Sequence, residues 1–136
     1  MGRPLNQRRR IQRKGQDMKY LLLIYEKEAD WAAIPEAEKG KVFQEYMDYS
    51  KRIRKSGNYI GGEALQPVSN ATTVREKNGK TLTTDGPFAE TREQLGGFYL
   101  VEARDLDEAI GLAKGIPAVR TGSIEVRPIM PTPPVE

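Results

Sequence analysis

The 136-residue sequence contains neither cysteine nor histidine. Without cysteine the chain has no disulfides, thiolate metal sites, cysteine nucleophiles or iron–sulfur clusters. Without histidine it lacks the commonest transition-metal ligand and the usual general base near neutral pH. Its longest uninterrupted apolar run, Tyr20 to Tyr25, is far shorter than the roughly 20 residues of a membrane span. We therefore expect a single-domain cytoplasmic protein with no cofactor and no membrane contact.

The positive charge is concentrated at the start of the chain. Residues 1–17 carry six Lys and Arg against the single acid Asp17, whereas the chain from Met18 on carries 16 Lys and Arg against 18 Asp and Glu. Three interpretations of residues 1–17 stay open: a disordered tail or mis-called start, a basic segment that binds phosphates, or a targeting segment. The first is favoured because Met18 opens a strand and Lys14-Gly15 could be encoded by a purine-rich ribosome-binding site. A nucleic-acid partner would depend on residues 1–17 alone and is not expected.

Hydrophobic periodicity predicts six strands and two helices from residue 18 to residue 131, with 132–136 as a tail. A stripe at Val42, Tyr46, Tyr49 and Ile53, widened by Phe43 and Met47, predicts a helix over 36–56. A capping box at 105–108 opens a second helix that ends before Pro117. Trp31 is expected in a loop. The expected strands are 18–26, 59–65, 71–77, 80–85, 97–103 and 123–130.

These elements follow the order β-α-β-β-β-α-β, in which Asn78-Gly79 closes a hairpin of type I′ inserted into the pattern. Without the insertion the order is that of a ferredoxin-like α+β fold. Two helices can cover one face of the main sheet, yet the strands at Met18–Tyr25 and Phe98–Val101 are apolar on both faces. A second copy of the chain is the simplest cover, so we expect a homodimer with its two sheets packed face to face.

The segment from Thr84 to Tyr99 is unusually long and polar for a connection, and it contains Asp85-Gly86-Pro87-Phe88. This run resembles the signature of the DGPF branch of the YCII-related family. The resemblance extends to Met18-Lys19-Tyr20, Gly61-Gly62-Glu63 and Glu125-Val126-Arg127-Pro128. It implies a dimeric α+β barrel.

The resemblance also implies partners and activities. Some relatives are linked to dehalogenation of lactones and use a His–Asp pair, which this chain cannot have because it contains no histidine. Genes of the DGPF branch often lie beside those of extracytoplasmic-function sigma factors, which implies a regulatory association. Two function classes follow: a cleft that binds or converts a small organic acid or lactone, and a non-catalytic interaction module.

In the first class, Asp85 and Glu63 are the candidate catalytic carboxylates, because a carboxylate beside a like charge can reach a useful pKa. Arg127 would anchor the ligand, with Glu93, Tyr25, Trp31 and Phe88 around it. The structural alternative makes Asp85 a turn cap, Glu63 and Arg127 an ion pair, Glu90 and Glu93 solvated groups, and Tyr25 and Trp31 core or interface aromatics. We expect no metal site.

Overall fold

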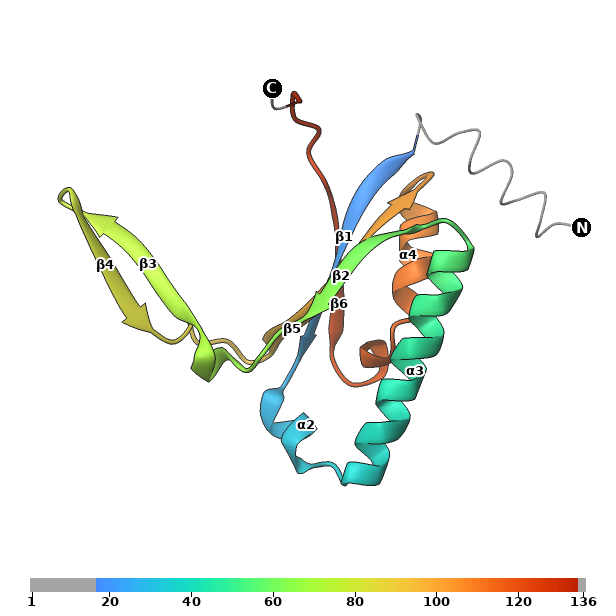
Figure 1. The fold of residues 1–136 in the computed structure, drawn as a ribbon, viewed down its shortest axis with the longest axis horizontal. Helices are drawn as coiled ribbons and strands as arrows, with labels where there is room; N and C mark the ends of the chain where they lie inside the picture. Colours follow the sequence, from blue (N-terminus) through green and yellow to red (C-terminus); the bar gives the residue numbers. More distant parts are fainter. Residues whose placement is uncertain (1–16, 135–136) are drawn as a thin grey trace, which may run out of the picture.

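The structure is a computed structural model that describes residues 17–134, so the predictions for residues 1–16 lie outside it. Four strands form one antiparallel sheet in the order β2-β5-β1-β6 (Figure 1). This order, with the two middle strands from the first and third positions of the pattern, is that of the ferredoxin-like fold. The sheet strands are β1 (Met18–Glu26), β2 (Tyr59–Ala64), β5 (Gln94–Ala103) and β6 (Ser123–Pro128).

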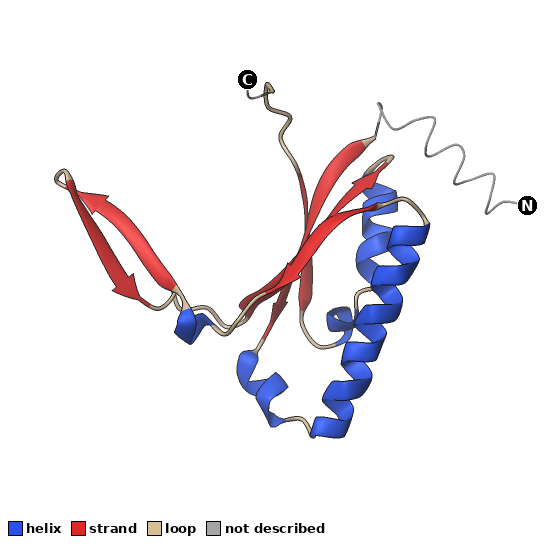
Figure 2. Cartoon of the chain, viewed as in Figure 1, coloured by secondary structure: helices blue, strands red, loops and turns tan. Residues whose placement is uncertain are grey.

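Helices α3 (Glu36–Lys55) and α4 (Leu106–Lys114) lie on one side of this sheet (Figure 2). They cover the side on which β1 presents Tyr20, Leu22 and Ile24, which are 2%, 0% and 7% exposed. Alternate residues of a strand point to opposite faces, so the intervening residues of β1 belong to the other face. The hydrophobic core therefore lies between the helices and one face of the sheet. Its other main members are Tyr49, Ile53, Tyr99, Val101, Ala103, Ala109, Ala113, Ile116 and Ala118.

Local signals explain where both helices begin and end. Pro35 is the N-cap of α3, and after its C-cap Ser56 the chain turns at Gly57, whose φ of 86° suits a residue without a Cβ. Asp105 caps α4 by accepting a hydrogen bond from the backbone N–H of Glu108, and the Glu108 carboxylate accepts one from the N–H of Arg104. This reciprocal pair confirms the predicted capping box.

The structure corrects three details of the sequence prediction. Trp31 lies in a short helix, α2 (Glu28–Ala33), rather than in a loop, and a 3-10 turn at Pro117–Arg120 follows α4. Strand β5 begins at Gln94, three residues earlier than predicted, because β1 extends to Glu26 and pairs with it there. Phe43 and Met47 do not widen the buried stripe of α3, since they are 59% and 57% exposed.

The inserted hairpin projects from the sheet as a separate two-stranded ribbon (Figure 1). Its strands are β3 (Thr72–Lys77) and β4 (Lys80–Asp85), and we refer to residues Thr72–Asp85 as the arm. At its tip Asn78 and Gly79 have φ values of 54° and 77°, which confirms the predicted turn with two residues of positive φ. A three-residue 3-10 turn, Val68–Asn70, joins β2 to the arm.

No helix among the residues that the structure describes is long and apolar enough to cross a membrane.

A substitution at Gly122 tests the close contact between the end of β1 and the turn before β6. A Cβ at this position would lie 2.0 Å from the carbonyl oxygen of Tyr25, which is backbone and cannot rotate away. We predict that Gly122→Ala lowers the free energy of unfolding by about 3 kcal/mol through this overpacking. The control is Gly111→Ala, because Gly111 lies in helix α4 with open space around it, and alanine there should stabilise by about 0.8 kcal/mol. Thermal melts of both variants measure the difference, and equal melting temperatures would contradict the packing.

Candidate functional site

Among residues 17–134, no helix lies over the sheet face opposite α3 and α4, which has an apolar centre (Figure 2); we call it the open face. Leu21 pairs with Leu100 and Leu23 with Phe98 across β1 and β5, and paired residues of an antiparallel sheet point to the same side. Leu23 is 9% exposed, whereas the other three are partly buried. None of the four belongs to the core cluster on the helical side. The prediction of strands apolar on both faces is therefore confirmed.

A polar cluster adjoins this apolar centre along β6. The Tyr25 hydroxyl donates to Oε1 of Glu125 at 3.4 Å, and Nε of Arg127 donates to Oε2 of the same carboxylate at 2.9 Å. The second Arg127 nitrogen, Nη2, also donates to this oxygen. The hydrogen bond and charge of Glu125 raise the pKa of Arg127, so the guanidinium stays charged. Arg127 and Glu125 are two residues apart on one strand, which places both on the open face.

Glu93 joins the same end of the sheet through Ser123. The Ser123 hydroxyl donates to Oε1 of Glu93 at 2.9 Å, and Ser123 pairs with Tyr25 across β6 and β1. The structure therefore brings together three of the predicted ligand-binding residues, Tyr25, Glu93 and Arg127. Glu125 and Ser123 were not among the predicted site residues, although the two-residue alternation with Arg127 was a signal that could have found them.

Glu63 lies on the same open face but at its opposite edge. One row of paired residues runs across the sheet from Glu63 through Phe98 and Leu23 to Glu125. Three strand spacings of about 4.8 Å put the ends of this row about 14 Å apart. The alternative in which Glu63 and Arg127 form an ion pair is therefore wrong: Arg127 pairs with Glu125, its neighbour on β6.

Asp85 and Phe88 lie at the root of the arm. Asp85 is the last residue of β4 and is exposed, and Phe88 is 77% exposed in the loop that follows. The backbone N–H of Gly86 donates to the carbonyl of Ala71 at 2.7 Å and the Thr73 hydroxyl donates to the carbonyl of Gly86, which fixes this root. Within the described part of the chain, no hydrogen bond or ion pair joins the Asp85 or Phe88 side chain to the Tyr25 cluster, so their functional roles stay predictions.

Trp31 belongs to the helical side of the protomer. Its ring meets Phe43 of α3 edge to face, with centroids 5.7 Å apart, and Nζ of Lys39 lies 5.7 Å from the Trp31 centroid. These contacts hold α2 against the start of α3. Trp31 therefore packs against α3.

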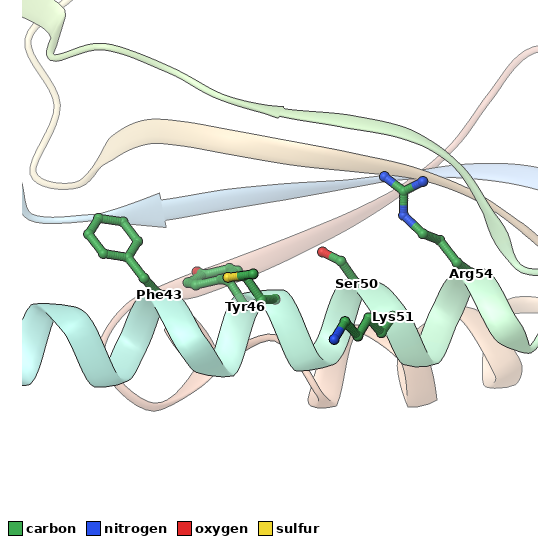
Figure 3. Close-up of a pocket in the computed structure, with 6 residues that line it drawn as sticks. Phe43, Tyr46, Ser50, Lys51 and Arg54 are labelled. Atoms are coloured by element: carbon green, nitrogen blue, oxygen red, sulfur yellow. The ribbon is translucent and has the colours of Figure 1, made fainter.

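A groove of about 530 Å³ runs along α3 beside the sheet (Figure 3). It is mostly apolar at Phe43 and Met47 and ends at Lys51 and Arg54. The Arg54 guanidinium lies 4.1 Å from the centre of the Tyr59 ring. Sequence patterning did not indicate this groove, because Phe43 and Met47 read as part of the buried stripe. The other residues that line it are Tyr46 and Ser50.

Tyrosines form the buried layer beneath this groove. The hydroxyls of Ser50 and Tyr99 are hydrogen-bonded at 2.8 Å, and the hydroxyl of Tyr49 donates to the carbonyl of Leu112 at 2.7 Å. Burial raises the pKa of Tyr46, Tyr49 and Tyr99, so all three phenols are neutral near pH 7. They are hydrogen-bonding groups of the core rather than candidate bases.

Within residues 17–134, no three Asp or Glu side chains gather in a way that could hold a metal ion.

Two comparisons bear on the family. The model of the YCII-related domain matches residues 18–133 of the chain. An uncharacterised protein of Rhizobium meliloti (strain 1021) is 37% identical over 114 residues, which are 82% of this chain and 92% of that protein. The family match begins at Met18, directly after the basic segment of residues 1–17. It spans the whole sheet, the arm and helices α3 and α4.

The buried tyrosines predict how stability depends on alkaline pH. An unfolded tyrosine ionises near pH 10, whereas burial raises the pKa of Tyr46 in the folded chain. Above about pH 10 the folded state therefore binds more protons than the unfolded state, and the free energy of unfolding falls as the pH rises. Tyr46→Phe should make this fall less steep. Denaturant titrations at increasing pH measure the slope, and identical slopes for the variant and the wild type would refute the assignment.

Proposed function

The chain belongs to the YCII-related domain family, and from this and its open face we propose that it is a homodimer whose two sheets enclose a small-molecule cleft. The observation that carries the proposal is an apolar sheet centre, Leu21, Leu23, Phe98 and Leu100, that no helix of its own protomer covers. Burial of such a surface is favourable in proportion to its area, at roughly 25 cal/mol per Å². The motif Asp85-Gly86-Pro87-Phe88 supports placing the chain in the DGPF branch.

The polar cluster supports a location for the cleft at the Tyr25 end of the open face. Donors and acceptors stand there beside apolar surface, which is the usual composition of a small-molecule site. Tyr25 and Arg127 supply donors, and Glu93 and Glu125 supply carboxylates that could accept a proton. Asp85 and Glu63, the two carboxylates expected from the sequence to be catalytic, are retained in the proposal as candidates on the rim.

The charge of the cluster favours one of the two ligand classes. Glu125 already neutralises Arg127, so the cluster of one guanidinium and two carboxylates carries a net charge of −1. A small organic acid would have to displace Glu125 and would meet Glu93, whereas a neutral lactone could accept a hydrogen bond from a guanidinium N–H of Arg127 that Glu125 does not use, without charge repulsion. We therefore favour a lactone or another small neutral ester as the ligand.

The dimer has a direct test in the molar mass of the protein. Light scattering at micromolar concentration should give about twice the 15.3 kDa of one chain. Leu100→Lys puts a charge in the centre of the proposed interface and should reduce the mass to that of one chain, with the helical circular dichroism unchanged. The control is Leu106→Lys on α4, where Leu106 is 49% exposed and outside the open face. A wild-type protein that is monomeric at micromolar concentration would overturn the proposed dimer.

The ligand class is tested by thermal shift with a panel of small lactones and carboxylates of matched size. A ligand at ten times its Kd stabilises the folded state by about 1.4 kcal/mol. For a domain of this size the melting temperature then rises by about 5 °C. Arg127→Gln should remove the shift given by the lactones.

Arg120→Gln is the matched control. Arg120 forms a comparably exposed ion pair with Glu45, with a nitrogen-to-oxygen distance of 2.7 Å, and this pair does not lie on the open face. A shift with carboxylates but not with lactones would contradict the charge argument. No shift from any compound would favour the second class, a non-catalytic interaction or regulatory module.

A further inference from the structure

The arm has no cover in its own protomer. Within residues 17–134, no hydrogen bond or ion pair joins the arm to another strand or helix. Every residue of β4 is exposed, and so is every residue of β3 except Thr73. A lone two-stranded ribbon is marginally stable in water at best. The arm therefore lacks, within one protomer, the packing that would hold a ribbon of this length in order.

Apolar side chains stand on both faces of the arm. Val74 pairs with Thr83 and Leu82 pairs with Arg75, so Val74 and Leu82 point to opposite faces. They are 64% and 46% exposed. The segment that leads into the arm is nevertheless fixed to the body, since the N–H of Val68 donates to the carboxylate of Glu28 at 3.0 Å. The arm is thus held at its root and extends away from the sheet with no contact beyond it.

The size of the open face indicates what the arm contacts. Four strands at about 4.8 Å spacing and six residues in length give the sheet a flat area of about 400 Å². A standard stable interface buries about 800 Å² on each partner. The arm is joined to β2 at its start and to β5 at its end, and both β2 and β5 are strands of the sheet that carries the open face (Figure 1). A second copy docked on that face therefore lies where the arm can reach it, and each face of the arm adds about 200 Å².

Charge supports the same occupant. The face of the arm that carries Leu82 also carries Arg75, Lys77 and Lys80, none of which has an acidic partner among residues 17–134. From Met18 on, the chain has 16 Lys and Arg against 18 Asp and Glu, whereas the arm has three against two. Outside the arm, the chain from Met18 on is therefore net negative, whereas the arm is net positive, and opposite net charges favour the association of the arm with a second copy.

We propose that the arm of each protomer packs against the body of the partner, so that two arms embrace the dimer and extend the interface beyond the open face. The proposal rests on the sheet-to-sheet dimer proposed above. It accounts for an exposed ribbon that would be marginal alone, and it assigns the inserted hairpin a role in assembly.

The test compares dimer dissociation constants by sedimentation velocity over a dilution series. Val74→Lys and Leu82→Lys each remove an apolar contact of the arm, and each should raise the dissociation constant at least tenfold. Met47→Lys is the control, because Met47 is 57% exposed on α3, on the side of the sheet opposite the open face. Circular dichroism of each variant confirms that the fold is retained.

A second measurement follows the arm itself by hydrogen exchange. In the wild-type dimer the amides of the arm should be protected, and in the monomeric Leu100→Lys variant they should exchange freely while those of β1 stay protected. Equal exchange of the arm in both proteins would overturn the proposal. A wild-type dimer with arm variants of unchanged affinity would also overturn it and leave the sheet-to-sheet dimer standing, whereas a monomeric wild type would overturn both.

Nucleic acid is the competing partner for the basic face of the arm. Lys77 and Lys80 lie directly opposite each other, an arrangement that costs stability unless an anion is near. Fluorescence anisotropy with a DNA duplex at low and high salt decides this point. We expect no saturable binding. Binding that disappears in the triple variant with Arg75, Lys77 and Lys80 changed to Ser, together with an unchanged dimer, would make the arm a nucleic-acid element and overturn the proposal.

Discussion

Strand β1 is apolar on both faces and hydrogen-bonded along both edges, and the rest of the structure depends on this constraint. Tyr20, Leu22 and Ile24 are buried beneath the helices, which satisfies one face of the sheet. Its odd-numbered residues Leu21 and Leu23 belong to the other face, for which one protomer offers no helix. In the proposed dimer, this face carries both the partner and the cleft.

The fold was largely predictable because its signals are local. The α3 stripe at Tyr49 and Ile53, the capping box of α4 and the Asn78-Gly79 turn each act within a few residues, and all three appear in the structure. Helix α2 was not predicted, since its six residues carry no buried side chain and no side-chain cap. The early start of β5 depends on its pairing with β1, a long-range contact that periodicity within one segment cannot show.

The candidate site was less predictable than the fold, for a related reason. Residues on one strand, such as Glu125 and Arg127, can be placed on a common face from their spacing. Whether Glu63 approaches Arg127 depends instead on strand order, and the order β2-β5-β1-β6 sends these two residues to opposite edges. The exposure of Phe43 and Met47 likewise depends on how α3 is positioned over the sheet, which the residue spacing within the helix does not determine. Side-chain type and spacing therefore predicted which residues share the open face better than they predicted the pairs within it.

Solvent access to the leucine methyl groups of the open face tests the central claim most directly. In a methyl-resolved NMR spectrum with a soluble paramagnetic agent, the signals of Leu21 and Leu100 should be as protected as those of Leu22, which is 0% exposed in the core. Protection of this degree requires a second molecule on the face. Broadening as strong as that of Leu106, which is 49% exposed on α4, would show that the face is open to water and would contradict the account.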